Sequence, residues 1–166
     1  MSDQLTPQDV LSKGLQRTFE GKNLERPLIF ATQDATTLMS SLGSDHYEDM
    51  FIGTFDNTKT IGLDVAVTST KVMLGRTYNG GTISVEELSK LGIDKKSVNS
   101  FLGQTIVAKP WTRLNEDVKY KNELFFYEYK VTKRHPLINA ISGEETIFYN
   151  DQPVALHIVT ISPIEG

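Results

Sequence analysis

Aromatic and basic residues are interleaved in two short segments, a combination that suits the binding of single-stranded nucleic acids. Residues 109–113 read Lys-Pro-Trp-Thr-Arg, so the only tryptophan of the chain lies between two cations. In residues 129–134, Tyr129 precedes three further cations. A base stacked on an exposed ring contributes about 1–3 kcal/mol, while Lys and Arg contact the phosphates. Alternatively, the tryptophan covers a sheet edge and the tyrosine fills the core, as strand aromatics often do.

The distribution of charge along the chain favours the same function. Residues 1–64 carry a net charge of −5, residues 65–134 carry +5 and residues 135–166 carry −4. A basic centre attracts phosphates, and it also attracts the acidic ends of a second copy of the chain. The candidate nucleic-acid-binding residues of this centre are Lys71, Arg76, Lys95, Lys96, Lys109, Trp111, Arg113, Tyr129, Lys130, Lys133 and Arg134.

Residues 84–103 have the pattern of a short helical hairpin. Ser84 and Glu87 have the spacing of a capping box, which marks the start of a helix. Gly92 is suited to end that helix, and Asp94 is suited to cap the next one. Two short helices are therefore expected in this segment.

This hairpin resembles a helix-turn-helix unit, with Gly92 at the turn. The resemblance implies that Lys95 and Lys96 lie near the exposed start of a recognition helix. The segment departs from that family at Leu88, four residues before the turn glycine, where a small residue is usual. A plain helical hairpin packed on a sheet is the alternative.

Several other chemistries lack the residues that they require. The chain has no cysteine, so disulfides, thiolate metal sites and cysteine nucleophiles are excluded. Residues 75–82 have the glycine spacing of a phosphate-binding loop, but Gly81 replaces its lysine. In residues 45–49, acidic residues lie on both sides of His46. No second histidine lies at the spacing of a zinc site, so this segment is weak evidence for one. We expect no metal, no cofactor and no catalytic residue, and leave open whether the histidines converge, namely His46, His135 and His157.

The periodicity of apolar residues predicts the remaining elements. An N-terminal helix is expected within residues 1–22, because Thr6 and Pro7 are typical of a helix start. Residues 50–78 predict a meander of three strands, antiparallel because such short links cannot form a parallel crossover. Residues 104–162 predict further antiparallel strands. Shorter patterns predict a strand over Pro27–Ala31, a helix over Thr36–Leu42 and a strand over Gln104–Ala108.

We therefore expect an α+β fold with a mainly antiparallel sheet, an N-terminal helix and the helical hairpin. No linker divides the chain, so residues 1–166 are expected to form one domain. The order of elements over residues 50–134 resembles that of an OB-type, partly open barrel. An ordinary α+β sheet with helices on one face explains the pattern equally well.

The expected function is that of a non-catalytic binding protein whose basic centre binds nucleic acid, either single-stranded DNA or RNA or duplex DNA. The alternative is a module for protein–protein interaction or homo-oligomer assembly. An enzyme ranks last, since no local catalytic motif supports it. The chain lacks an N-terminal signal sequence and an apolar run of about 20 residues, so we expect a cytoplasmic protein without membrane contact.

Overall fold

One antiparallel sheet organises the part of the chain that the computed structural model describes, namely residues 5–22, 24–27, 35–52, 58–69, 73–110 and 112–164. The sheet has nine strands in the order β1-β2-β3-β4-β5-β9-β8-β7-β6. In chain order, the elements are α1 (Pro7–Phe19), β1 (Leu24–Pro27), β2 (Ala35–Leu42), β3 (Asp45–Ile52), β4 (Lys59–Val67), β5 (Met73–Thr82), α2 (Val85–Lys90), α3 (Lys95–Ala108), β6 (Val118–Lys121), β7 (Phe125–His135), β8 (Ala140–Tyr149) and β9 (Gln152–Ile164).

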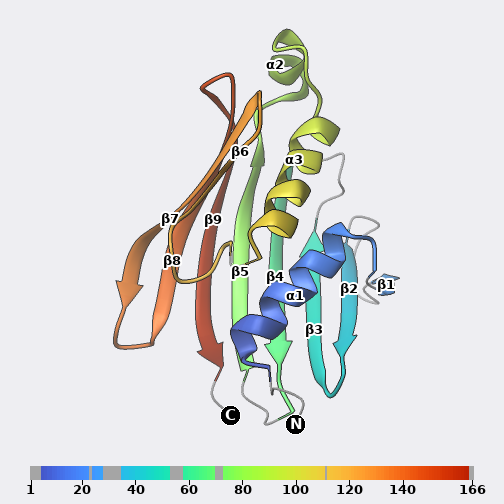
Figure 1. Ribbon diagram of the computed structural model, residues 1–166, viewed down its shortest axis with the longest axis vertical. Coiled ribbons are helices and arrows are strands. Elements are labelled where there is room, and N and C mark those ends of the chain that lie inside the picture. Colours follow the sequence, from blue (N-terminus) through green and yellow to red (C-terminus); the bar gives the residue numbers. More distant parts are fainter. Residues whose placement is uncertain are drawn as a thin grey trace.

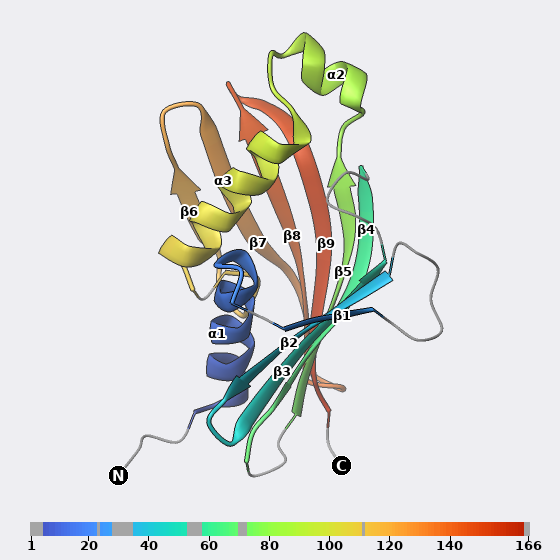
Figure 2. The ribbon, with the colours of Figure 1, turned by 90° about the vertical axis from the view of Figure 1, so that its right-hand side faces the viewer.

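The sheet consists of two series of sequential hairpins that meet in its middle. Strands β1 to β5 follow one another across the sheet, β9 to β6 continue in reverse order, and β5 pairs with β9. Helices α1 and α3 lie on one face of the sheet, which curves around them (Figures 1 and 2). We call this the inner face and the opposite side the outer face.

The longer helices begin at local sequence signals. The Thr6 hydroxyl accepts the backbone N–H of Asp9 at 3.1 Å, and the Asp9 carboxylate accepts the backbone N–H of Thr6 at 2.9 Å. Asp94 caps α3 by accepting the backbone N–H of Ser97 at 2.8 Å. Because these helices are amphipathic, their apolar sides then cover the inner face. The buried apolar residues of α1 and α3 are Val10, Leu11, Leu15, Val98, Phe101, Leu102 and Ile106.

The structure confirms the α+β fold with its antiparallel sheet, N-terminal helix and helical hairpin. The predicted three-strand meander corresponds to β3, β4 and β5. The sheet is open, with β1 and β6 at its two edges, so the resemblance to an OB-type barrel is not confirmed. Of the strand predicted over residues 27–31, only Pro27 lies within the described residues, where it ends β1.

Two predicted elements were wrong. Residues 36–42, predicted as a helix, belong to β2, which pairs with β3 along its whole length. Residues 104–108, predicted as a strand, complete α3, where Val98, Leu102 and Ile106 recur every fourth residue on the buried side. In both segments the conformation depends on the packing partner, which is the adjacent strand β3 for residues 36–42 and the inner face of the sheet for residues 104–108.

No helix in the described parts of the chain is a candidate for crossing a membrane. Helices α1, α2 and α3 have 13, 6 and 14 residues, respectively. A transmembrane helix needs about 20 mostly apolar residues.

Candidate functional site

A row of buried charged side chains crosses the inner face. Asp49, Asp64 and Arg76 are direct neighbours on β3, β4 and β5. Arg76 Nε donates to Asp64 Oδ2 at 2.5 Å, and Arg76 Nη2 contacts the same carboxylate. The Tyr47 hydroxyl donates to Asp64 at 2.9 Å, and the Tyr78 hydroxyl donates to Asp49 at 2.8 Å. The row therefore contains one ion pair and a second acid, Asp49.

The surroundings of Asp49 favour its neutral form. Burial, and then the negative charge of Asp64, raise the pKa of Asp49 well above its ordinary value. A protonated Asp49 can donate to Asp64 while it accepts from Tyr78. Burial likewise raises the pKa of Tyr78 well above its ordinary value, so that hydroxyl remains a donor. With Asp49 protonated, the row of Asp49, Asp64 and Arg76 has no net charge.

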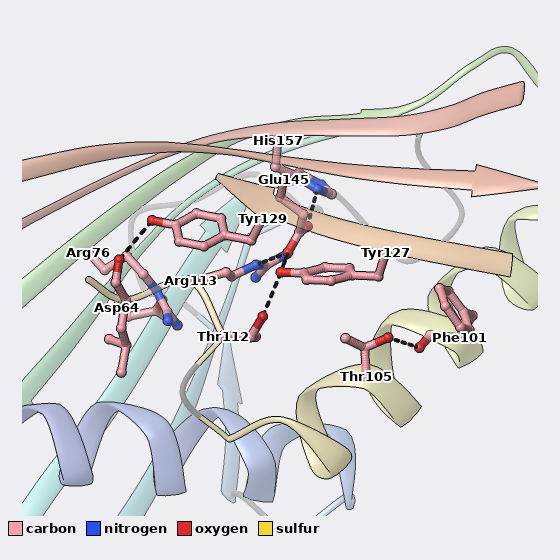
Figure 3. Close-up of polar contacts among 11 residues, drawn as sticks. Asp64, Arg76, Phe101, Thr105, Thr112, Arg113, Tyr127, Tyr129, Glu145 and His157 are labelled. Atoms are coloured by element: carbon pink, nitrogen blue, oxygen red, sulfur yellow. Dashed lines mark hydrogen bonds and ion pairs between the residues drawn. The ribbon is translucent and has the colours of Figure 1, made fainter. Parts of the chain in front are cut away.

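A second buried cluster has Glu145 of β8 at its centre (Figure 3). The Glu145 carboxylate accepts from Arg113 Nε at 2.5 Å and Arg113 Nη2 at 2.6 Å. It also contacts the Tyr127 hydroxyl at 2.8 Å and His157 Nδ1 at 2.7 Å. Burial acts to raise the pKa of Glu145, but the Arg113 guanidinium outweighs burial and holds that pKa well below its ordinary value. Glu145 is therefore a carboxylate fixed by a bidentate ion pair.

Arg113 reaches Glu145 from the segment that follows α3. Its backbone has a φ of 60°, which is uncommon for a residue other than glycine. Its guanidinium lies 5.7 Å from the ring centroid of Tyr78, within the range of a cation–π interaction. Because Tyr78 donates to Asp49, this contact joins the two clusters into one polar layer between the sheet and the helices.

A cavity of about 100 Å³ adjoins this polar layer. Its polar wall includes Asp49 from β3, Thr82 from β5, Arg113 and His157 from β9. Its apolar wall is contributed by α1, α3 and the inner face of the sheet. Representative apolar residues are Leu15, Phe19, Phe51, Val98, Leu102 and Ile147. A mostly apolar hollow with a few positioned polar groups is the usual form of a small-molecule site.

Three of the predicted nucleic-acid-binding residues are buried in the interior. Nucleic-acid binding requires Arg76 and Arg113 on an accessible face, and for these two residues that expectation was wrong. For Tyr129 the sequence left two alternatives open, and the structure places it in the core. Both guanidinium groups neutralise buried carboxylates. The Tyr129 hydroxyl donates to the backbone carbonyl of Leu114 at 2.9 Å, and burial raises the pKa of Tyr129 to about 12.

The predicted cations around α3 lie at opposite ends of that helix. Lys95 and Lys96 occupy its first turn, and Lys109 follows its last residue. A helix of this length separates them by about 20 Å. Two further candidates, Lys71 and Trp111, lie outside the described residues.

The remaining predicted cations lie on β7, where two of the three have partners. Lys130 pairs with Glu128 at 2.7 Å. Arg134 donates to the backbone carbonyl of Asn115 at 2.6 Å. Lys133 is exposed on the same strand. Nucleic-acid binding through these residues stays a prediction.

The three histidines have separate partners. His46 contacts Glu48 at 3.1 Å, and His135 contacts Ser142 at 3.2 Å. His157 belongs to the buried Glu145 cluster. Across the described ranges, no group of three or more potential metal ligands gathers.

Most residues of the cavity and its polar layer are not among the site residues predicted from the sequence. Glu145 was not singled out, because no local motif contains it. Asp49 and Thr82 were considered only within residues 45–49 and 75–82, whose patterns did not suit a zinc site or a phosphate-binding loop. A usable signal was present in β9, where His157 alternates with apolar residues at inward positions. A polar residue at an inward position of a strand needs a buried partner, which indicates a polar network.

The chain matches no protein-family model, no curated protein and no solved structure in the comparisons made with known proteins, so the site is interpreted from its geometry and chemistry alone.

Proposed function

We propose that the protein binds a small molecule in the cavity between the inner face of the sheet and helices α1 and α3. The supporting observation is the mostly apolar wall of this cavity, whose polar residues include Asp49, Thr82, Arg113 and His157. Three of these four polar residues have fixed partners within the fold, so the wall is organised before a ligand arrives. The proposal keeps the expected class, a non-catalytic binding protein, and assigns it a different ligand.

The volume of the cavity limits the size of the ligand. Sites for drug-sized molecules have about 300–1,000 Å³, and an engineered apolar cavity of about 150 Å³ binds benzene. The part of the ligand enclosed in about 100 Å³ is therefore no larger than one small ring.

Toluene is a suitable first probe, and ligand-detected NMR on the full chain measures its binding. We expect saturable binding with a dissociation constant on the order of 1 mM, which corresponds to about −4 kcal/mol. The variant Ala155→Leu adds carbon atoms to the cavity wall and should abolish this binding.

The matched control is Leu156→Phe, which enlarges the next residue of β9 on its exposed side. This variant should bind toluene as the unmodified protein does. Circular dichroism establishes that both variants fold. Toluene that fails to bind the unmodified protein, or that binds Ala155→Leu equally well, would contradict the proposal.

A second candidate function, assembly with a second copy of the chain, is favoured by the outer face of the sheet. Ile52 and Ile61 are directly opposite on β3 and β4, with exposed fractions of 55% and 53%. Asn79 separates Ile61 from Ile158, which is 48% exposed on β9. Exposed aliphatic residues aligned on a sheet can pack against the same face of another copy.

Sedimentation over a range of protein concentrations tests this assembly. We expect a dimer that the variant Ile61→Lys converts to a monomer, because the lysine would place a charge between the two sheets. The control Ile138→Lys, in the exposed turn between β7 and β8, should leave the dimer intact. A protein that is monomeric at every concentration would contradict assembly. A mass increase seen only with a labelled single-stranded oligonucleotide would support nucleic-acid binding instead.

A further inference from the structure

Two polar side chains of the cavity wall are neighbours on the inner face. Gly80 and Thr82 of β5 are paired with His157 and Ala155 of β9, respectively. Directly paired residues point to the same face, and residues two apart on one strand do so as well. Thr82 and His157 are therefore diagonal neighbours that both line the cavity.

The imidazole of His157 is oriented by Glu145. Its Nδ1 lies 2.7 Å from a carboxylate oxygen of Glu145, and that carboxylate is kept ionised by Arg113. A carboxylate accepts only, so Nδ1 carries a proton, and in the neutral imidazole Nε2 is then a hydrogen-bond acceptor. No hydrogen bond from a described residue reaches Nε2.

The position of the His157 ring also depends on Gly80. A Cβ atom at Gly80 would lie 2.8 Å from Cδ2 of His157, and closer still to the backbone of β9. The absence of a side chain there leaves room for the ring beside β5.

Thr82 supplies a hydroxyl without a hydrogen-bond partner among the described residues. Its Oγ1 is buried and makes no hydrogen bond within the described part of the protein. A buried hydroxyl without a partner is unfavourable, and a ligand that bonds to it removes this cost. With a neutral imidazole, the cavity wall thus includes an acceptor, Nε2 of His157, and the Thr82 hydroxyl, which can donate.

We propose that Thr82 and His157 form a subsite for a hydroxyl group of the ligand. The ligand O–H donates to Nε2 of His157, and the ligand oxygen accepts the hydroxyl proton of Thr82. The proposal rests on the proposed function, small-molecule binding in the cavity, and specifies the ligand as a small neutral alcohol or phenol. A neutral group suits two charged residues of the wall, because Arg113 is compensated by Glu145 and the pKa of Asp49 is raised by burial and by Asp64. Lys95, at the start of α3, also lines the cavity.

Three probes with one ring, phenol, anisole and toluene, test separately whether the subsite needs a ligand that donates or accepts a hydrogen bond. Phenol can donate and accept, anisole can only accept, and toluene can do neither. By ligand-detected NMR on the full chain, we expect phenol to bind about tenfold more tightly than toluene, with anisole close to toluene.

The isosteric variant Thr82→Val removes the hydroxyl and keeps the shape of the side chain. It should lower phenol affinity severalfold and leave toluene affinity unchanged. The matched control is Thr60→Val, on β4 in the wall of the same cavity, which should preserve the phenol-to-toluene ratio. Equal affinities of phenol and toluene, or an unchanged ratio in Thr82→Val, would overturn the hydroxyl subsite and leave ligand binding in the cavity standing. Failure of all three probes would overturn both proposals.

Discussion

Replacement of Glu145 by alanine is expected to lower the free energy of unfolding by about 3–5 kcal/mol, because it leaves the guanidinium of Arg113 buried without its counterion. In this variant the Tyr127 hydroxyl and His157 Nδ1 also lose the carboxylate that accepts their hydrogen bonds. Urea unfolding at neutral pH measures the loss, since the midpoint and slope together give the free energy of unfolding.

The neighbouring Glu144 provides a matched control on the same strand. Its side chain is exposed, so Glu144→Ala should change the free energy of unfolding by less than about 0.5 kcal/mol. Equal effects of the two substitutions would mean that the bidentate ion pair of Glu145 and Arg113 contributes no more than a surface charge.

The same ion pair predicts how stability responds to acid. The pKa of Glu145 is lower in the folded protein than in the unfolded chain. The contribution of Glu145 to the free energy of unfolding is therefore complete above its pKa in the unfolded chain. It is lost as the pH falls below that value towards the pKa of Glu145 in the folded protein. Acid should therefore favour the unfolded chain, because that chain binds a proton on Glu145 at pH values where the folded protein does not.

Features specified by neighbouring residues could be predicted from the sequence. The caps formed by Thr6 with Asp9 and by Asp94 with Ser97 involve residues three apart. Short links between strands likewise fix antiparallel pairing, as in β3, β4 and β5. These interactions close within a few residues, so local patterns describe them well.

The buried polar layer could not be predicted in this way. Arg113 and Glu145 are 32 residues apart, and Arg76 finds Asp64 across a strand pair. In a sum of charges by segment, both arginines count as free cations. In the structure, Arg76 forms an ion pair with Asp64 of β4, and Arg113 forms one with Glu145 of β8. The same limit applies to Tyr129, whose hydroxyl partner lies 15 residues away in the segment before β6.

Strand β4 shows that the sequence can leave the orientation of an alternating strand undecided. Ile61 belongs to the apolar residues on one face of this strand, and Asp64 and Ala66 lie on the other face. The structure turns Asp64 and Ala66 towards the core and leaves Ile61 more than half exposed. The ion pair with Arg76 makes burial of Asp64 favourable, and this partner becomes known only once the sheet is assembled.

Asp49→Asn is expected to remove a pH dependence from the stability of the protein. The pKa of Asp49 is raised in the folded state, so above the unfolded pKa the folded protein binds a proton that the unfolded chain has released. The contribution of Asp49 to the free energy of unfolding is complete below its pKa in the unfolded chain. It is lost as the pH rises from that value towards the pKa of Asp49 in the folded protein. The loss approaches about 1.4 kcal/mol per pH unit within that window.

Asparagine mimics the protonated acid, because its amide can donate to Asp64 and its carbonyl can accept from Tyr78. Urea unfolding at a series of pH values should therefore show that the variant gains stability relative to the unmodified protein as the pH rises from about 4. The control Asp151→Asn changes an exposed carboxyl in the turn between β8 and β9, and its curve should run parallel to that of the unmodified protein. Parallel curves for Asp49→Asn as well would mean that Asp49 is ionised beside Asp64. In that case the layer would carry a net negative charge, and the cavity would favour a cationic ligand over the neutral alcohol proposed above.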